Sequence, residues 1–469
     1  MTGPAHEGKE QAKPKAAPTE EGYGLQPEYV RAVAAALDQG DTERVEELVL
    51  PLHYADLADL LELLHPEERR LVIEIIRPQF DPEILTELDE SVRREVMAQL
   101  GTTDVAAAIT ELDSNDAVGL VEDLDEAVRQ ELLEAVPAEE RAVLEQALTY
   151  PEDSAGRLMQ RELVAVPAYW TVGEVIDYLR SAKNLPDDFY DLFVVDPKHR
   201  PVGTIPLSRV LRTTRPVPVG DIMDREADSK VVPVTMDQEE VAHLFRHQDP
   251  VSVPVVDEAG RLVGVITVDD VVDVIDEEAE KDLMHLAGVS ETDIYRAIVD
   301  TIRARFPWLL VNLGTAIAAS VVIGFFAATI EQIVALAVLM PIVASMGGNA
   351  GTQTLTVAVR ALAMKDLTPT NALRIIGKEV LVGGVNGVLF AVFAGTVAGF
   401  WFQDLGIALI MAAAMIVNMV VAGLAGAAIP LGLALRRIDP AIASAVFLTT
   451  ITDVVGFFVF LGLAAWLLL

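Results

Sequence analysis

The sequence contains no cysteine among its 469 residues. It therefore forms no disulfide, builds no thiolate metal site and carries no cysteine nucleophile. The N-terminal residues also lack the apolar core that a secretory signal peptide requires. We therefore expect the soluble part of the chain to be cytoplasmic.

Catalytic constellations are also scarce. No nucleophile lies in a recognisable arrangement with a base, and the seven histidines show metal-ligand spacing only at His243 and His247. These two lie four residues apart on a predicted helix, but no third ligand is evident, so we interpret them as surface residues. The sequence therefore predicts that the protein is not an enzyme.

Positive charge is in short supply in one part of the chain. The whole sequence has 35 basic and 71 acidic residues, for a net charge of −36. From Phe306 onward six basic residues balance six acidic ones, so residues 1–305 carry 29 basic and 65 acidic residues. This charge disfavours nucleic acid and anionic lipid as partners and attracts cations. A solubility surface or adaptation to high salt would give the same charge, so both alternatives stay open.

The first 149 residues divide into a tail and a helical domain. Residues 1–24 are rich in Pro, Lys, Glu, Gly and Ala, which is typical of a disordered tail. Residues 25–149 have leucines at three- and four-residue spacing, which predicts an acidic α-helical domain. Helix starts with an acidic first turn are predicted four times, after Leu64, Leu88, Leu124 and Val136. Such repeated helical hairpins indicate a small α-superhelix.

Residues 150–275 contain an internal duplication, with copies at 150–213 and 214–275. Each copy reads strand–helix–strand–turn–strand–helix, with the spacing Val-Asp-x-x-x-x-x-Val-Gly at its turn. This pattern resembles the cystathionine-β-synthase-type (CBS) domain, two copies of which normally pack as a pair. We therefore predict one α/β tandem CBS module. CBS pairs often bind an adenine nucleotide. No Gly-rich phosphate loop supports such a site here, so we keep the nucleotide only as an alternative cofactor.

Acidic residues gather at three points of the soluble part. Asp113 and Asp116 lie in an acidic turn of the helical domain, where they act as helix caps or as cation ligands. A second group lies in or beside the second CBS copy, at Asp237, Glu239, Asp249, Asp269 and Asp270. A helical pattern then runs from Val271 into a connecting segment at residues 276–302. Carboxylates lie along one face of this pattern, at Asp273, Asp276, Glu277 and Glu280. Such a row repels itself unless cations neutralise it, and a solvated helix is the alternative.

Residues 303–469 predict an all-α membrane domain. Five apolar segments are long enough to span a bilayer, at residues 306–330, 332–361, 379–402, 405–435 and 440–469. Every flanking basic residue falls on the side of the soluble part, and the two opposite loops offer only Glu331 and Asp404. The positive-inside rule therefore places the N-terminal domains in the cytoplasm and the C-terminus outside.

The second apolar segment is interrupted by residues that a lipid-facing helix does not need. They are Pro341, Gly347, Gly348, Asn349, Gly351 and Gln353. At membrane depth such residues line an ion path or form a close helix contact, and both interpretations stay open. Asn418, in the fourth segment, is a weaker candidate, because one Asn is often only a helix–helix hydrogen bond.

The last apolar segment contains Asp453, with Thr449 and Thr452 beside it. We interpret Asp453 as the only carboxylate in the interior of a span, with no Lys or Arg at its depth. A lone carboxylate at mid-bilayer costs about 3 kcal/mol or more, so a proton, water or a passing cation must compensate it. The available ligands are all oxygen, which Mg²⁺ and Ca²⁺ prefer. We therefore predict a path for a hard, hydrated cation, with these lining residues: Pro341, Gly347, Gly348, Asn349, Gly351, Gln353, Thr449 and Thr452.

The whole order of domains resembles the MgtE family of magnesium channels over residues 25–469. The motifs that carry the resemblance are Ser154-Ala-Gly-Arg-Leu-Met159, Met340-Pro-x-x-x-x-Met-Gly-Gly-Asn-x-Gly-x-Gln353 and Thr449-Thr-x-Thr-Asp-x-x-Gly-Phe457. The resemblance implies a homodimer in the cell (inner) membrane, with the pore on its two-fold axis. The second and fifth membrane helices would line this pore, and Asp453 would hold a hydrated Mg²⁺.

The resemblance also implies regulatory Mg²⁺ sites in the soluble part. They carry over to Gly156, Asp237, Glu239, Asp249, Asp270, Asp273, Glu278, Asp282 and Asp439, with Asp113 and Asp116 as the matching positions of the helical domain. Lys281 stands at an acidic position of the family's connecting helix, which puts one ligand in doubt. The implied function is Mg²⁺ uptake that closes when cytosolic Mg²⁺ bridges these carboxylates and the connecting helix plugs the pore.

Two other functions compete with this prediction. A proton- or Na⁺-coupled divalent cation transporter would also have interrupted helices near the midplane of the bilayer. A membrane-anchored nucleotide sensor would use the CBS pair as its receptor and the apolar segments as its anchor. Proton dependence of the flux would favour the first alternative, and tight nucleotide binding without any effect of Mg²⁺ would favour the second.

Overall fold

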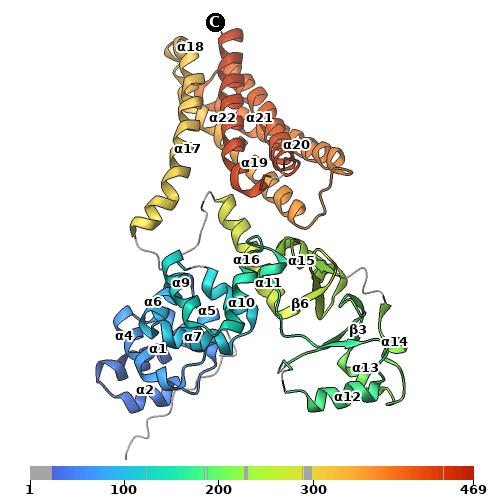
Figure 1. Cartoon of the computed structure of the whole chain (residues 1–469). Coiled ribbons are helices and arrows are strands. Elements are labelled where there is room, and N and C mark those ends of the chain that lie inside the picture. Colours follow the sequence, from blue (N-terminus) through green and yellow to red (C-terminus); the bar gives the residue numbers. More distant parts are fainter. Residues whose placement is uncertain are drawn as a thin grey trace, which may run out of the picture. The chain divides into compact units, whose positions relative to one another are not determined.

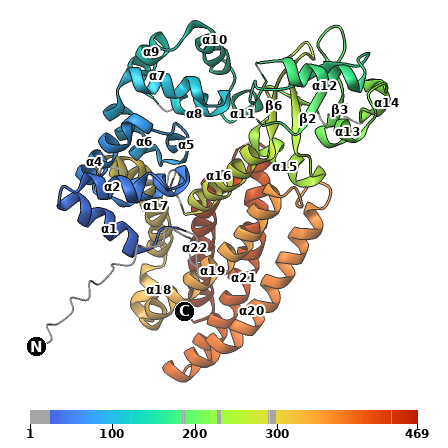
Figure 2. The same cartoon turned by 90° about the horizontal axis from the view of Figure 1, so that it is seen from below.

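A computed structural model of the chain describes residues 24–122, 124–183, 185–186, 188–225, 231–287, 289, 298–436 and 438–468. The chain divides into two compact units, Met1–Ile275 and Asp276–Leu469. Figures 1 and 2 show the elements of both from two directions. The first unit contains the N-terminal helices and two small sheets, and the second contains the long apolar helices.

The first unit begins with helices that pack around one core of Leu, Val, Ile and Ala side chains. Their bounds are α1 (Pro27–Asp38), α2 (Thr42–Val49), α3 (Tyr54–Leu63), α4 (Pro66–Ile76), η1 (Arg77–Gln79), α5 (Ile84–Glu87), α6 (Glu90–Leu100), α7 (Thr102–Glu111), α8 (Ser114–Glu122), α9 (Glu126–Ala135) and α10 (Ala138–Ala147). The four predicted helix starts are confirmed, at α4, α6, α9 and α10. Leu64, Leu88 and Val136, which precede three of these starts, are buried and anchor the chain before each helix.

Two three-stranded sheets follow, one in each copy of the duplication. The first copy has α11 (Ala155–Leu158), β1 (Ala165–Pro167), α12 (Val172–Ser181), β2 (Asp191–Val195), β3 (Pro201–Pro206) and α13 (Leu207–Arg212). The second has α14 (Val219–Ile222), β4 (Val232–Pro233), α15 (Gln238–Gln248), β5 (Ser252–Val256), β6 (Leu262–Thr267) and α16 (Val268–Leu286). In both sheets the first strand pairs parallel with the second, and the second pairs antiparallel with the third.

The duplication extends to an irregularity of the strands. The register of β2 and β3 shifts between Val194 and Val195, and that of β5 and β6 shifts between Val255 and Val256. Each shift lies directly before the aspartate of the repeated turn, Asp196 in the first copy and Asp257 in the second. The predicted α/β duplication is therefore confirmed to the level of a matching bulge.

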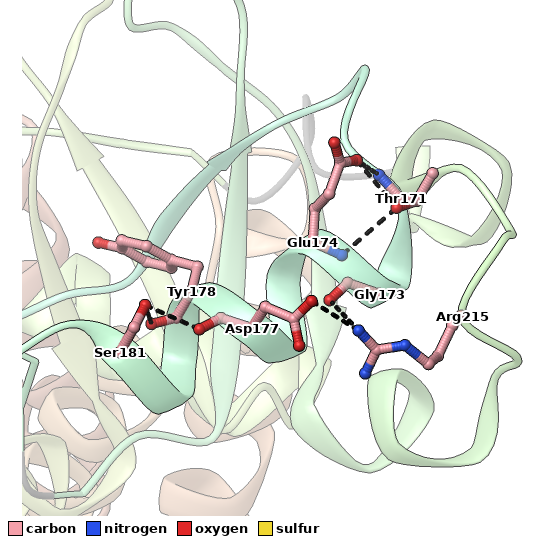
Figure 3. A network of polar contacts seen from close by, with 7 residues as sticks. All are labelled: Thr171, Gly173, Glu174, Asp177, Tyr178, Ser181 and Arg215. Atoms are coloured by element: carbon pink, nitrogen blue, oxygen red, sulfur yellow. Dashed lines mark hydrogen bonds and ion pairs between the residues drawn. The ribbon is translucent and has the colours of Figure 1, made fainter.

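Helix α12 illustrates how local chemistry fixes an element (Figure 3). The backbone N–H of Thr171 donates to Glu174 Oε2 at 2.7 Å, and the Glu174 N–H donates to Thr171 Oγ1 at 3.3 Å. This reciprocal capping box satisfies donors that the first turn of a helix leaves unpaired. Arg215 Nη2 donates to the Gly173 carbonyl at 3.2 Å and to Asp177 Oδ2 at 2.6 Å, and so ties the segment between α13 and α14 to α12.

The second unit contains the apolar helices. They are α17 (Ile298–Phe325), α18 (Ala327–Gln332), α19 (Ala335–Ala363), α20 (Ala372–Phe402), α21 (Leu405–Ala434) and α22 (Pro440–Leu467). Within the described residues five helices are long and apolar enough to cross a membrane, as predicted. Two details differ from the prediction. The first span ends at Phe325 before the short helix α18, and α20 begins at Ala372, which places Glu379 inside a helix rather than at its start.

Small residues allow the apolar helices to approach each other closely. A side chain at Gly383 of α20 would meet the Met419 carbonyl oxygen of α21 at 2.5 Å, and one at Gly423 of α21 would meet the Glu379 carbonyl oxygen at 2.6 Å. Two backbones can come this near only where both lack a side chain at the crossing. The fold class predicted from the sequence is thus confirmed: a helical N-terminal part, a tandem CBS module and five apolar helices.

Candidate functional site

Helix α19 contains the segment that interrupts the second apolar run, and it is continuous through Pro341 and its three glycines. Polar residues recur along its exposed face, at Ser345, Asn349, Thr352, Gln353 and Thr356. Spacings of three and four residues place these side chains in one row, which we call the polar stripe. A row of hydroxyl and amide groups is costly against hydrocarbon, so it requires water or a partner surface.

The opposite face of α19 packs against neighbouring helices. Gly347 and Gly351 are buried there. A side chain at Gly351 would meet Leu448 of α22 at 2.8 Å, and one at Gly347 would overlap the amide of Asn418 of α21. The close helix contact is therefore present on one face of the segment, and the ion path stays a prediction for the polar stripe on the other face. Pro341, Asn349 and Gln353 are exposed, Gly348 is partly exposed, and Gly347 and Gly351 form helix contacts.

Helix α22 carries Asp453, which is partly buried. Thr449, one turn before it, is exposed, and its hydroxyl donates to the Ala445 carbonyl of its own helix at 2.9 Å. Thr452 is fully buried, and its hydroxyl reaches the carbonyls of Leu448 and Thr449, each at 3.1 Å. Thr452 therefore packs inside the helix bundle, whereas Thr449 lies on the exposed face of α22.

Glu379 was missed as a second carboxylate within an apolar helix. Its side chain is only 14% exposed, and its Oε2 accepts a hydrogen bond from Thr354 Oγ1 of α19 at 3.2 Å. The predicted third apolar segment starts at Glu379, because two basic residues, Arg374 and Lys378, lie just before it. Asp453 is therefore not the only carboxylate within a helix long enough to span a membrane, since α20 begins two turns before Glu379.

A strongly acidic cavity of about 680 Å³ lies in the first unit. Ten of its lining residues are carboxylates: Glu83, Glu87, Asp113, Asp116, Glu162, Asp188, Asp191, Asp269, Asp270 and Asp273. Among the described residues that line it, none is Lys, Arg or His. The cavity therefore brings together Asp113, Asp116, Asp270 and Asp273 of the predicted regulatory set. Glu83 and Glu87 were missed, because they come from a separate part of the chain, where Glu83 directly precedes the short helix α5 and Glu87 ends it.

Asp270 is the most densely bonded carboxylate of this cavity. Its oxygens accept from Thr267 Oγ1 at 2.6 Å, from Asn115 Nδ2 at 2.9 Å and from Gln160 Nε2 at 3.2 Å. Asn115 comes from α8, whereas Thr267 and Asp270 lie at the start of α16, so the bond joins the helical part to the CBS module. Asn115 Oδ1 is buried and has no hydrogen-bond partner within the described structure. An unpartnered buried oxygen next to several carboxylates is an available cation ligand.

Burial raises the pKa values of several carboxylates that line this cavity. Burial, together with the nearby charges of Asp270 and Glu83, raises the pKa of Asp116 to about 7. Burial likewise raises the pKa of Asp270 to about 6, although the Thr267 hydroxyl opposes the shift. The pKa of Glu83 is also raised, first by burial and then by Asp113. The charged forms of these groups are therefore undercompensated, which a bound cation would correct.

Four predicted regulatory residues lie at the two ends of α15. The backbone N–H of Gly156 donates to the Val234 carbonyl at 2.9 Å, and Ser154 pairs with Asp237, so Gly156 and Asp237 are neighbours. Asp237 caps α15 through the Glu239 N–H at 2.9 Å. Asp249 follows the other end of the helix, about 16 Å away at 1.5 Å per residue. One copy of the chain therefore cannot join Asp249 to the other three in a single site.

The remaining predicted residues form a cluster in the second unit. Burial raises the pKa of Asp282, and the charges of Asp439 and Glu278 raise it further. This cluster differs from the cavity because a lysine and a histidine lie among its carboxylates. Lys281 Nζ lies 3.1 Å from Glu277 Oε1 and 3.2 Å from Glu278 Oε1, and His285 Nδ1 lies 2.9 Å from Asp439 Oδ2. Lys281 thus forms ion pairs with two of the carboxylates of α16.

The acidic side chains of the described residues are spread out rather than gathered into a compact metal cage. Within this part of the chain, no three His, Cys, Asp or Glu side chains converge into a ready-made metal site. This is compatible with Mg²⁺, which keeps several of its waters and needs only one or two direct carboxylate ligands. It disfavours a tightly held transition metal, which takes three or four protein ligands.

Comparisons with protein families agree with this arrangement. Residues 340–463 match the MgtE family model, described as a divalent cation transporter. Residues 52–153 match the MgtE intracellular N domain, and residues 155–214 and 219–277 match the CBS domain. The polar stripe, Asp453 and most of the acidic cavity therefore lie within matched segments.

Individual relatives match over almost the whole chain. The magnesium transporter MgtE of Thermus thermophilus is 33% identical over 442 residues, covering 92% of this chain and 97% of the relative. The magnesium transporter MgtE of Bacillus subtilis is 28% identical over 443 residues, covering 93% of this chain and 97% of the relative. Among solved structures, the cytosolic domain of the Mg²⁺ channel MgtE in complex with ATP is 34% identical, with a TM-score of 0.49. It covers 52% of this chain and 99% of that structure.

The raised pKa values predict that acid stabilises the contact between α8 and α16 when divalent cations are absent. The protonated forms of Asp116 and Asp270 are favoured in the folded state, so their contribution is complete below their ordinary pKa of 3.8 and is lost as pH rises through about 6 to 7. A tenfold difference in acidity between the folded and unfolded states corresponds to about 1.4 kcal/mol. We expect the α8 amides, measured in EDTA on the whole protein, to have higher protection factors at pH 5.5 than at pH 8, after correction for the faster intrinsic exchange at the higher pH.

Asp116→Asn is the matched test, because the amide cannot ionise. It should flatten this pH dependence, whereas Asp125→Asn, at an exposed position before α9 without a capping bond, should leave it unchanged. Equal protection of wild-type α8 at both pH values would contradict the assignment.

Proposed function

Because the chain belongs to the MgtE family of divalent cation transporters, we propose that it is a Mg²⁺ channel whose path runs along α19 and α22. The observation that carries this proposal is the polar stripe on the exposed face of α19, from Ser345 to Thr356. Its groups are hydroxyls and amides, which suit the water shell of a hard cation and offer nothing to a soft one. Asp453 supplies the negative charge that such a path requires.

The proposed path needs a second copy of the chain. One Asp453 is too little charge to strip waters from Mg²⁺, which holds its hydration shell strongly. Two copies of Asp453 about a two-fold axis would hold a hydrated ion between them, so we infer a homodimer in the lipid bilayer. The exposed stripe then faces the water-filled path, and the lipid-facing surfaces are the apolar faces of α17 and α20, which carry exposed residues such as Leu309 and Phe393.

Asp453→Asn tests the path. We expect Mg²⁺ flux into proteoliposomes to fall about tenfold or more, because losing a contact with a charged group costs about 1.5–3 kcal/mol. Glu331→Gln, at an exposed carboxylate of α18, is the control for a lost negative charge and should keep wild-type flux. Undiminished flux in Asp453→Asn would contradict the pore assignment. Wild-type flux that stops when the proton gradient is collapsed would instead indicate a coupled transporter.

We further propose that the acidic cavity is a cytosolic Mg²⁺ sensor. Asp116, Asp270 and the unpartnered Asn115 Oδ1 are oxygen ligands that fit Mg²⁺, and the raised pKa values of the two carboxylates reflect missing positive charge. Carboxylates from α5, α8 and α16 repel each other when the cavity holds no cation. Neutralising them favours the arrangement in which α8 and α16 are in contact, by the difference in Mg²⁺ affinity between the closed and open arrangements.

The second unit offers a way for α16 to act on the path. Leu286, the last residue of α16, packs against a cluster that includes Leu355 of α19 and Leu448 of α22. His285 Nδ1 contacts Asp439, which caps the start of α22. We propose that α16 closes the cytosolic end of the path through these contacts and that Asp282, Glu278 and Asp439 hold Mg²⁺ there. The Lys281 ion pairs reduce the charge that such an ion has to neutralise.

Asp116→Asn separates Mg²⁺ sensing from packing. We expect α8 of the whole protein to be protected from hydrogen exchange already in EDTA and to gain little when Mg²⁺ is raised to millimolar levels. Wild type should gain protection over the same range, because its cavity carboxylates need the cation. Asp125→Asn should behave as wild type, and a wild type that gains no protection would contradict the sensor.

The arrangement in the membrane follows from charge and from the proposed path. We infer that the soluble part lies in the cytoplasm and that the C-terminus lies outside, with the chain in the cell membrane. The absence of cysteine gives a clean test. A membrane-impermeant maleimide should label Leu467→Cys in intact cells and Asp366→Cys only after permeabilisation. The reverse pattern would contradict the orientation.

The CBS module also offers a nucleotide site. The cavity extends between the two copies, where Phe189 and Tyr190 lie near Thr267. Aromatic rings and a hydroxyl suit a nucleoside, but ten carboxylates repel free phosphates. We therefore propose that an adenine nucleotide binds here as its Mg²⁺ complex, as a modulator rather than as a substrate.

A further inference from the structure

Asn418 lies at a junction of three apolar helices. It is fully buried in the middle of α21, and its Nδ2 donates a hydrogen bond to the Val343 carbonyl of α19 at 2.8 Å. A side chain at Gly456 of α22 would meet this Nδ2 at 2.8 Å, and one at Gly347 of α19 would overlap it. The amide of one residue therefore touches both helices of the proposed path.

The neighbours of Asn418 lie close to the residues that would contact the ion. Gly456 follows Asp453 by three residues, and Gly347 precedes Asn349 by two, which is a rise of about 4.5 Å and about 3 Å along each helix. Gly347 is buried and Asn349 is exposed, so the amide supports α19 from behind the polar stripe. A shift of either helix against Asn418 would change the height of Asp453 relative to Asn349.

A simple role as a helix–helix hydrogen bond does not account for the whole amide. Asn418 Oδ1 is buried and has no hydrogen-bond partner within the described structure. Leaving a buried acceptor unpaired costs about 1–3 kcal/mol, so an apolar residue of similar size would pack more favourably. In a membrane interior, polar groups that are retained at such a cost are usually tied to function.

We propose that Asn418 is a positioning residue for permeation, which holds α19 and α22 at one relative height and thereby sets how the path fits the hydrated ion. The inference builds on the proposed path along these two helices and adds the residue that fixes its geometry. Gly347 of α19 and Gly456 of α22 leave the space that the Asn418 amide occupies. A larger side chain at either position would force its helix away from the amide. Asn418 itself does not touch the ion.

The test is a cycle between Asn418 and Gly347. Gly347→Ala places a methyl group into the amide and should lower Mg²⁺ flux. Asn418→Ala removes the amide, so the double variant should recover flux by about threefold or more over Gly347→Ala, within the range of coupling between touching residues. Gly432→Ala, in α21 with open space around it, is the control and should keep wild-type flux.

Ion discrimination separates positioning from stability. We expect Asn418→Ala to change the half-saturating Mg²⁺ concentration and the ratio of Mg²⁺ to Ca²⁺ flux by about threefold or more, an effect of the size seen for coupled neighbours. Asn418→Ser, which keeps a small donor, should lie between Asn418→Ala and wild type, and it replaces Asn418→Ala if that variant does not fold.

The outcomes are distinct. A lower melting temperature with unchanged half-saturation and flux ratio would show that Asn418 only stabilises the bundle. Additive effects of Gly347→Ala and Asn418→Ala would likewise overturn the inference. Full flux in Asp453→Asn would overturn the proposed path itself, whatever the Asn418 variants do.

Discussion

Negative charge that lacks a nearby positive charge is the constraint on which both units depend. Burial removes water from the carboxylates of the first unit's cavity, and its described lining offers no basic side chain in return. Protons and hydrogen bonds provide partial compensation, as the pKa of about 7 at Asp116 and the three donors to Asp270 indicate. A cavity with such buried, unpaired carboxylates favours binding of a cation that fits it, because the ion supplies the positive charge that the lining residues lack. The proposed gating by Mg²⁺ then requires no specialised motif beyond this undercompensated cavity.

The membrane part solves a related problem with polarity rather than charge. One face of α19 is committed to close packing through Gly347 and Gly351, and this frees the other face to carry hydroxyls and amides. The helix stays continuous through Pro341, so the path does not depend on an unwound segment. Rigid packing behind a polar face keeps the ligand oxygens in place while the ion retains its waters. Asn418 belongs to this packing layer, although it is itself polar.

Much of this could be predicted from the sequence, and the failures have physical causes. Helix starts, the duplicated strands and five spans follow from local patterns, because leucine spacing, acidic first turns and apolar length act within a few residues. Glu83 and Glu87 were missed because they join Asp116 and Asp270 only through tertiary folding, and the bond from Asn115 to Asp270 was missed for the same reason. Glu379 was missed because basic neighbours suggested the end of a span. The fully buried Thr452 and the placement of Asp249 at the far end of α15 likewise depend on packing and helix length, which no motif records.

The two acidic clusters differ in how much they gain from a cation. Around α16 in the second unit, Lys281 pairs with Glu277 and Glu278, so part of the charge is neutralised by the chain itself. The cavity in the first unit has no such internal partner among its described lining residues. Because the benefit of a divalent ion scales with the charge it neutralises, the cavity gains more per ion bound. The threshold for closing should therefore be set chiefly by the cavity, and the cluster around Asp439 should contribute contacts that depend less on Mg²⁺.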